Sequence, residues 1–182
     1  LLSRLIVVPV HIVGNLVVVE AKWDKSGPWH FLVDTGSSAT LVSPEFAARH
    51  ATEEAAWQLP SVRVRGADGG TTVLNAVTIR RIELGDARFE RVQSLVYDCS
   101  ELSAHLGMRI DGVLGFPLFR DTILTLDYPQ SRLIMTTAGE PPLVPGTRLS
   151  FGAGAKIPLI PIGLGNRTLL ALIDSGSDGP LS

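Results

Sequence analysis

Residues 31–43 read FLVDTGSSATLVS, and they place an acid, Asp34, directly after three apolar residues and directly before Thr-Gly-Ser. A carboxylate at the end of an apolar strand is unfavourable unless it is hydrogen-bonded or used in a reaction. The next residues supply what such an acid needs. Thr35 offers a hydroxyl, Gly36 allows the backbone to turn sharply, and Ser37 offers a second hydroxyl close to the carboxylate.

The same pattern returns near the end of the chain. Residues 172–177, LIDSGS, repeat residues 32–37, LVDTGS, and each copy follows a turn and an apolar strand. A leucine stands at the same distance after each acid, at Leu41 and Leu181. An internal repeat indicates duplicated structural units. The chain is therefore predicted to contain one complete lobe and the first strands of a second, related lobe.

Two such loops brought face to face would place the carboxyl groups of Asp34 and Asp174 in contact. Like charges that close cannot both ionise, so the pair would share one proton. The ionised carboxylate can deprotonate a water molecule while its protonated partner donates to a carbonyl oxygen, which hydrolyses an amide without metal or covalent intermediate. We therefore predict Asp34 and Asp174 as catalytic, against the alternative that Asp34 only shapes a turn. The predicted supporting residues are Thr35, Gly36, Ser37, Ser175, Gly176 and Ser177.

Short runs of Val, Leu and Ile between Gly- and Pro-containing turns predict an all-β fold with short helices. Ser43 to Arg49 has the N-cap serine, early proline and early acid of a helix start, and Ser100 to Gly107 ends like a helix at a glycine. The predicted strands are Leu5–Val10, Leu16–Lys22, His30–Val33, Val62–Arg65, Thr71–Ile79, Arg81–Leu84, Phe89–Val96, Thr122–Leu126, Arg132–Met135, Lys156–Gly163 and Thr168–Ile173.

Two glycine-containing segments add to this pattern. The first, residues 66–70, lies between the predicted strands Val62–Arg65 and Thr71–Ile79 and predicts a β-hairpin with a glycine-rich tip. The second, residues 110–115, reads IDGVLG, and its Asp111 is interpreted, like Asp127, as an acid that shapes a turn. The predicted tip residues are Gly66, Ala67, Asp68, Gly69 and Gly70.

These motifs resemble those of pepsin-like and retropepsin-like aspartic peptidases. Residues 34–38, DTGSS, resemble the active-site loop, and residues 110–115 resemble the apolar-apolar-Gly segment that threads behind it, with Leu114 and Gly115 as its last residues. The hairpin at residues 62–79 falls where the family has its flap, although it lacks the tyrosine of pepsin-type flaps. The resemblance implies an acid-protease (retropepsin-like) β-barrel lobe and aspartic endopeptidase activity on peptide or protein substrates.

The resemblance covers about residues 5–136 and restarts near Lys156. We expect a complete lobe at 1–137, a Gly/Pro-rich linker at 138–155, and the first strands and catalytic loop of a truncated second lobe at 156–182. Three arrangements are open: Asp34 pairs with Asp174 in the same chain, with Asp34 of a second copy, or with no partner, and the repeated motif favours the first. We further expect that the natural protein continues past Ser182. Residues 1–182 alone are expected to be weakly active or inactive as a monomer, and either to dimerise through exposed strands or to require the missing lobe.

The composition excludes several other classes of protein. The 182 residues are 45% hydrophobic and 19% charged with a net charge of −2, and the scattered Arg residues indicate no nucleic-acid surface. No uninterrupted apolar stretch predicts a membrane span. Four scattered His residues and the single Cys99 show no metal-ligand spacing, so no metal or cofactor is expected. The compartment stays open, with a periplasmic or secreted location slightly favoured.

Two functions remain for such a domain. The first is an aspartic-type endopeptidase, and the second is a catalytically silent retropepsin-like module for binding or dimerisation, because fold does not determine function. The intact Asp-Thr-Gly-Ser sequence favours the enzyme. If the hydroxyls of Ser37 and Ser177 donate to the ionised acids, they lower the first apparent pKa of the pair, which predicts an activity optimum on the acid side of neutral.

Overall fold

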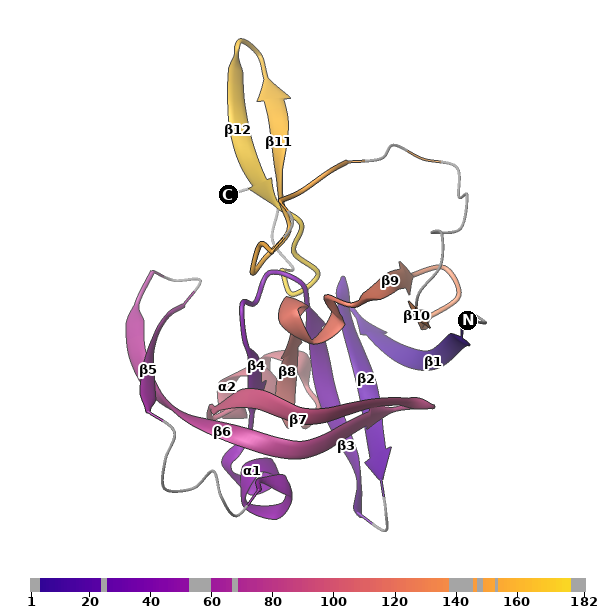
Figure 1. Cartoon of the computed structure of the whole chain (residues 1–182), viewed down its shortest axis with the longest axis vertical. Coiled ribbons are helices and arrows are strands. Elements are labelled where there is room, and N and C mark those ends of the chain that lie inside the picture. The colour runs from indigo at the N-terminus through magenta and orange to yellow at the C-terminus, as the bar shows by residue number, and fades with distance from the viewer. Residues whose placement is uncertain are drawn as a thin grey trace.

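The protein is described from a computed structural model (Figure 1). The structure describes residues 4–23, 26–52, 60–66, 69–137, 146, 149–152 and 154–177.

Strands make up most of the described residues, and the prediction of an all-β fold with short helices is confirmed. The helices are α1 (Pro44–His50), α2 (Ser100–Leu106) and a 3-10 turn at Phe116–Phe119. The strands are β1 (Arg4–Val13), β2 (Leu16–Trp23), β3 (Ser26–Asp34), β4 (Thr40–Val42), β5 (Ser61–Arg65), β6 (Thr71–Leu84), β7 (Ala87–Val96), β8 (Gly112–Gly115), β9 (Thr122–Asp127), β10 (Arg132–Thr137), β11 (Leu159–Leu164) and β12 (Arg167–Leu172).

Ten of these strands form one continuous sheet in the order β5-β6-β7-β4-β8-β3-β2-β1-β10-β9. Most neighbours are antiparallel, but β8 runs parallel to β3 on one edge and antiparallel to β4 on the other. The strand β8 therefore passes between the two strands that flank the Asp34 loop. Its last residue, Gly115, is paired with Asp34 itself.

The central hairpin β2–β3 is buried on both faces, which explains its nearly continuous apolar sequence. Val17, Val19 and Phe31 belong to the larger core cluster. Val18 and Leu32, from the alternate positions, belong to a second cluster that includes residues of α2 and β8. Because successive strand residues point to opposite faces, a strand covered on both sides needs apolar residues at every position.

Several sequence-based boundaries were wrong: β3 and β11 start at other residues than predicted, and β4 and β8 were not predicted as strands. A further difference concerns β6. Two separate strands were predicted for residues 71–79 and 81–84, but the structure has a single strand β6 over 71–84. Its first part pairs with β5 and its second part with β7. Arg80 is exposed and Arg81 pairs with Glu83, so the two arginines interrupt the apolar pattern without interrupting the strand.

The remaining hairpin, β11–β12, forms a two-stranded sheet of its own. Figure 1 shows it standing apart from the ten-stranded sheet, with the end of β12 directed toward the loop after β3. An isolated two-stranded hairpin is marginally stable in water. Residues 173–175 connect it to Val33 and Thr35 through hydrogen bonds described below. No helix among the described residues is long and apolar enough to cross a membrane.

Candidate active site

The site is built from the two repeated loops, which the structure brings together. The carboxyl groups of Asp34 and Asp174 are hydrogen-bonded to each other. Asp34 is the last residue of β3 and is partly buried, whereas Asp174 lies two residues after the end of β12 and is exposed. One chain can therefore place two carboxyl groups in contact.

Four reciprocal hydrogen bonds join the two loops beneath the acids. The Thr35 hydroxyl donates to the Ile173 carbonyl at 2.6 Å, and the Ser175 hydroxyl donates to the Val33 carbonyl at 2.8 Å. The Thr35 N–H donates to the Ser175 hydroxyl at 3.1 Å, and the Ser175 N–H donates to the Thr35 hydroxyl at 3.0 Å. Both side chains are buried, and each hydroxyl donates one hydrogen bond to the opposite repeat of the motif and accepts one from it. The sequence suggested donors for the acids here; the structure instead uses them to fix one loop against the other.

The glycine of each loop lies against the acid of the other. A methyl group at Gly36 would overlap the Asp174 carboxyl group, and one at Gly176 would overlap the Asp34 carboxyl group. Neither glycine lies in the left-handed backbone region. Glycine is therefore required by the close approach of the two acids, and not by the sharp turn that the sequence suggested.

Backbone N–H groups hold each carboxylate in place. Asp34 Oδ1 accepts from Gly36 N at 2.8 Å and from Ser37 N at 2.9 Å, and Asp174 Oδ1 accepts from Gly176 N at 2.8 Å. Burial, the neighbouring Asp174 charge and the hydrogen bond from Asp174 raise the pKa of Asp34 from 3.8 to about 6, against the lowering effect of the two N–H donors. A raised pKa keeps a proton on the pair in mildly acidic solution.

The expected role of the Ser37 hydroxyl is wrong. That hydroxyl donates to the Ala39 carbonyl at 2.8 Å and accepts from Ala39 N at 3.4 Å, so it closes a local turn. The Ser37 backbone N–H, and not its side chain, is the donor to Asp34. A serine three residues after an acid can bond either way, and the sequence alone does not distinguish them.

The Gly segment lies directly behind the Asp34 loop. Leu114 is fully buried, and Gly115 approaches the loop so closely that a methyl group would overlap the Ala39 carbonyl and lie 3.0 Å from the Ser37 carbonyl. The next residue, Phe116, donates its N–H to the Ser37 carbonyl at 3.0 Å. The end of β8 therefore supports the residue that donates to Asp34.

Two open spaces adjoin the loops. An apolar cavity of about 600 Å³ beside Asp174 is lined by Phe116, Phe119, Leu124, Phe151 and Ile173, among others. A groove of about 770 Å³ runs along β7 and is bordered by residues 38–40, the β5–β6 hairpin and the 3-10 turn. At the predicted tip of that hairpin, Gly66, Gly69 and Gly70 form a hydrogen-bonded turn, while Ala67 and Asp68 lie outside the described residues.

Two other titratable residues, Arg120 and Tyr128, line the cavity beside Asp174. His11 and His30 approach Glu20 at 3.3 Å and 3.8 Å on neighbouring strands. Burial raises the pKa of the Cys99 thiol to about 12, which keeps the thiol protonated and unreactive. In the described part of the chain, no group of three His, Cys, Asp or Glu residues could hold a metal ion. Ser177, the last described residue, is exposed.

Comparison with known proteins identifies the family of this chain. Residues 19–118, more than half of the chain, match the family described as "Aspartyl protease". The chain belongs to the aspartyl protease family. The matched residues include the Asp34 loop, the β5–β6 hairpin and β8, but not the Asp174 loop.

A solved structure with a similar fold is the retropepsin-like aspartic protease from Rickettsia conorii. The two chains share 18% sequence identity with a TM-score of 0.50, and the match covers 75% of this chain and 92% of that chain. At this identity the likeness shows the retropepsin-like fold alone. A search of curated proteins found no match.

Proposed function

We propose that this aspartyl protease family member is an aspartic endopeptidase in which Asp34 and Asp174 share one proton. The observation that carries the proposal is the pair of contacting carboxyl groups, each held by backbone N–H donors and each facing the glycine of the other loop. The ionised member of the pair takes a proton from a water molecule, and the protonated member donates to the carbonyl oxygen of the scissile bond. The water oxygen bonds to the carbonyl carbon and forms a tetrahedral intermediate. The C–N bond then breaks as the acid that took the proton from water gives it to the leaving amine nitrogen, and the hydroxyl proton of the intermediate returns to the other acid.

The surroundings of the pair favour an extended peptide with apolar side chains as substrate. The groove beside residues 38–40 and the cavity beside Asp174 lie next to the two loops, and both have mainly apolar walls. Apolar pockets with a few convergent polar groups are the usual form of a binding site. The β5–β6 hairpin borders the groove and is the element best placed to cover a bound peptide.

A second candidate is a binding module without turnover. It is favoured by the exposure of Asp174 and by the small hairpin that carries it, which pairs with no other strand in the described part of the structure. If this hairpin leaves the first lobe, Asp34 loses its partner acid and the shared proton, while the groove beside residues 38–40 stays intact.

Cleavage of an unfolded protein between pH 4 and 7 tests both candidates. We expect turnover that a peptide-like mimic of the tetrahedral intermediate inhibits, and a loss of at least about a thousandfold in Asp34→Asn, because an amide can neither act as the base nor share the proton. The matched control is Asp127→Asn, which removes an acid that pairs with Arg132 on β10. Wild-type turnover in Asp34→Asn contradicts the proposal that Asp34 catalyses peptide hydrolysis. Inhibitor binding without cleavage supports the binding module.

A further inference from the structure

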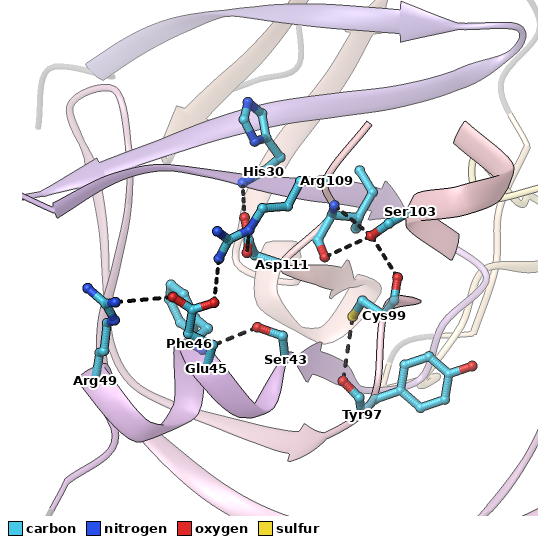
Figure 2. Close-up of polar contacts among 11 residues, drawn as sticks. His30, Ser43, Glu45, Phe46, Arg49, Tyr97, Cys99, Ser103, Arg109 and Asp111 are labelled. Carbon is cyan, nitrogen blue, oxygen red and sulfur yellow. Dashed lines mark hydrogen bonds and ion pairs between the residues drawn. The ribbon is translucent and has the colours of Figure 1, made fainter. Parts of the chain in front are cut away.

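Among the acids that the structure describes, Asp111 is the most completely buried, with a side chain that is only 2% exposed. Oδ1 accepts from Arg109 Nε at 2.6 Å, and Oδ2 accepts from His30 N at 2.9 Å (Figure 2). Its backbone N–H donates to the His30 carbonyl at 2.7 Å, and its carbonyl accepts from Ser43 N at 2.8 Å. The interpretation of Asp111 as a turn acid is therefore wrong: it is an internal junction between three segments.

The two partners His30 and Ser43 are the residues that bracket the Asp34 segment. His30 precedes Phe31 in β3, and Ser43 follows Val42 and caps α1. The chain between them, residues 31–42, consists of the end of β3, the Asp34 loop and β4, so it leaves Asp111 at β3 and returns to it at the start of α1. Asp111 thus joins the two ends of the segment whose tip carries Asp34.

The strand β8 runs from this junction to the tip of the same segment. Gly112 pairs with Phe31 and Val42 near the base, and Gly115 pairs with Asp34 at the tip. Phe116 N then bonds the Ser37 carbonyl. Because a short strand moves along its axis as a unit, the position at which Asp111 holds the start of β8 determines where Phe116 holds Ser37.

A surface network supports the junction from outside. Arg109 also donates from Nη2 to Glu45 Oε2 at 3.0 Å, and Glu45 accepts from Arg49 at 3.1 Å (Figure 2). The guanidinium groups of Arg109 and Arg49 lie over the Trp29 ring, at 5.1 and 5.5 Å from its centroid. This arrangement orients Arg109 and neutralises the buried carboxylate, which would be costly alone.

We infer that Asp111 is a positioning residue for the active site: by joining His30, Ser43 and Arg109, it sets the register of β8 and thereby the backbone N–H groups that hold Asp34. The inference rests on the proposed function for its catalytic consequence. Its geometric part concerns only the donors Gly36 N and Ser37 N. These donors lower the pKa of Asp34, so a displaced β8 weakens them and raises that pKa further.

The test compares Asp111→Asn with Asp127→Asn. The control is closely matched, because Asp127 also accepts from an arginine, at 2.6 Å, and from a backbone N–H, at 3.2 Å, but lies at the β9–β10 turn. Below the melting temperature of both variants, we expect Asp111→Asn to lower kcat by about tenfold to a hundredfold with KM nearly unchanged. We also expect a higher Asp34 titration midpoint and faster amide exchange at Gly36 and Ser37, both followed by NMR. Asp127→Asn should change none of these.

Two outcomes decide the inference. Unchanged Asp34 titration and unchanged exchange at Gly36 and Ser37 in Asp111→Asn overturn it, even if the variant melts earlier. Both NMR readouts need no turnover, so a protein without peptidase activity contradicts the proposed function and leaves this test intact. If Asp111→Asn does not fold, Arg109→Gln replaces it, because that variant retains the His30 N to Asp111 bond. Arg109→Gln should shift the Asp34 titration midpoint and the amide exchange at Gly36 and Ser37 in the same direction by a smaller amount. The absence of any shift would contradict the inference.

Discussion

The hairpins β2–β3 and β11–β12 carry nearly the same loop but have different surroundings. Val33, before Asp34, is fully buried, whereas Ile173, before Asp174, is 48% exposed. The strand β3 is paired on both edges, by β2 and β8, while β12 is paired only by β11 among the described strands. A six-residue motif is therefore sufficient to specify the polar geometry of each loop, but the support of each loop comes from distant parts of the chain.

Some contacts of the two loops are reciprocal, and others are made by one loop alone. The four hydrogen bonds through Thr35 and Ser175 are symmetric, and so is the contact of each glycine with the opposite acid. The support behind the loops is asymmetric, since Gly115 and Phe116 lie behind Asp34 alone. Substitutions at matched positions can therefore distinguish effects that belong to the pair from effects that belong to one lobe.

The largest effect is expected from the two glycines. In Gly36→Ala the new methyl group displaces the Asp174 carboxyl group, and in Gly176→Ala it displaces that of Asp34. Because the proposed mechanism needs both acids in contact, each variant should lose about a hundredfold or more in kcat. Peptide cleavage assays of both variants measure this, with Gly165→Ala, in the β11–β12 turn, as a control that strains the backbone far from the acids. A large loss in only one of the two loops contradicts the reciprocal arrangement.

The next effect concerns the free energy of unfolding, and it should differ between the two repeats of the motif. Leu32 and Leu172 occupy the same position of the repeat, but Leu32 is 3% exposed and Leu172 is 37% exposed. Truncating a buried leucine leaves a cavity, so Leu32→Ala should lower the free energy of unfolding by about 2–5 kcal/mol. Leu172→Ala should cost less than about 1 kcal/mol. Chemical denaturation of the two variants measures the difference, and equal costs would mean that β12 is as well buried as β3.

The sequence predicted the elements of this fold because strand alternation and turn residues are local signals. Val17 to Val19 and Phe31 to Val33 are apolar at every position and lie in segments that were predicted as strands, and the structure covers both faces of them. Prediction from the sequence failed where a side chain had two possible hydrogen-bond partners. The hydroxyls of Thr35 and Ser37 were assigned to the acids, yet one joins the two loops and the other closes a turn. The junction at Asp111 was missed because its partners at His30 and Ser43 are far away in sequence.

A smaller effect is expected from pH. The folded state raises the pKa of Asp34 from 3.8 to about 6, so it retains a proton that the unfolded state releases. This contribution to stability is complete below about pH 4 and is lost as the pH rises through about 6, by roughly 1–3 kcal/mol. Asp34→Asn has no such group, so it should be more stable than the wild type at pH 7 by about that amount, with the difference vanishing near pH 4. Denaturation curves at both pH values measure it, and a difference that grows toward acid pH contradicts the raised pKa.

The smallest effect is expected at Ser37, where the two roles of a serine can be separated. Its N–H donates to Asp34 and is untouched by Ser37→Ala, while its hydroxyl serves only the local turn with Ala39. The acidic limb of the pH–rate profile should therefore stay within about 0.2 units of the wild type, because one pKa unit corresponds to about 1.4 kcal/mol and no bond to the acid is removed. Stability should fall by about 1 kcal/mol through the lost turn bond. An upward shift of the acidic limb by half a unit or more would show that the hydroxyl turns to Asp34 during turnover, as its place in the sequence first suggested.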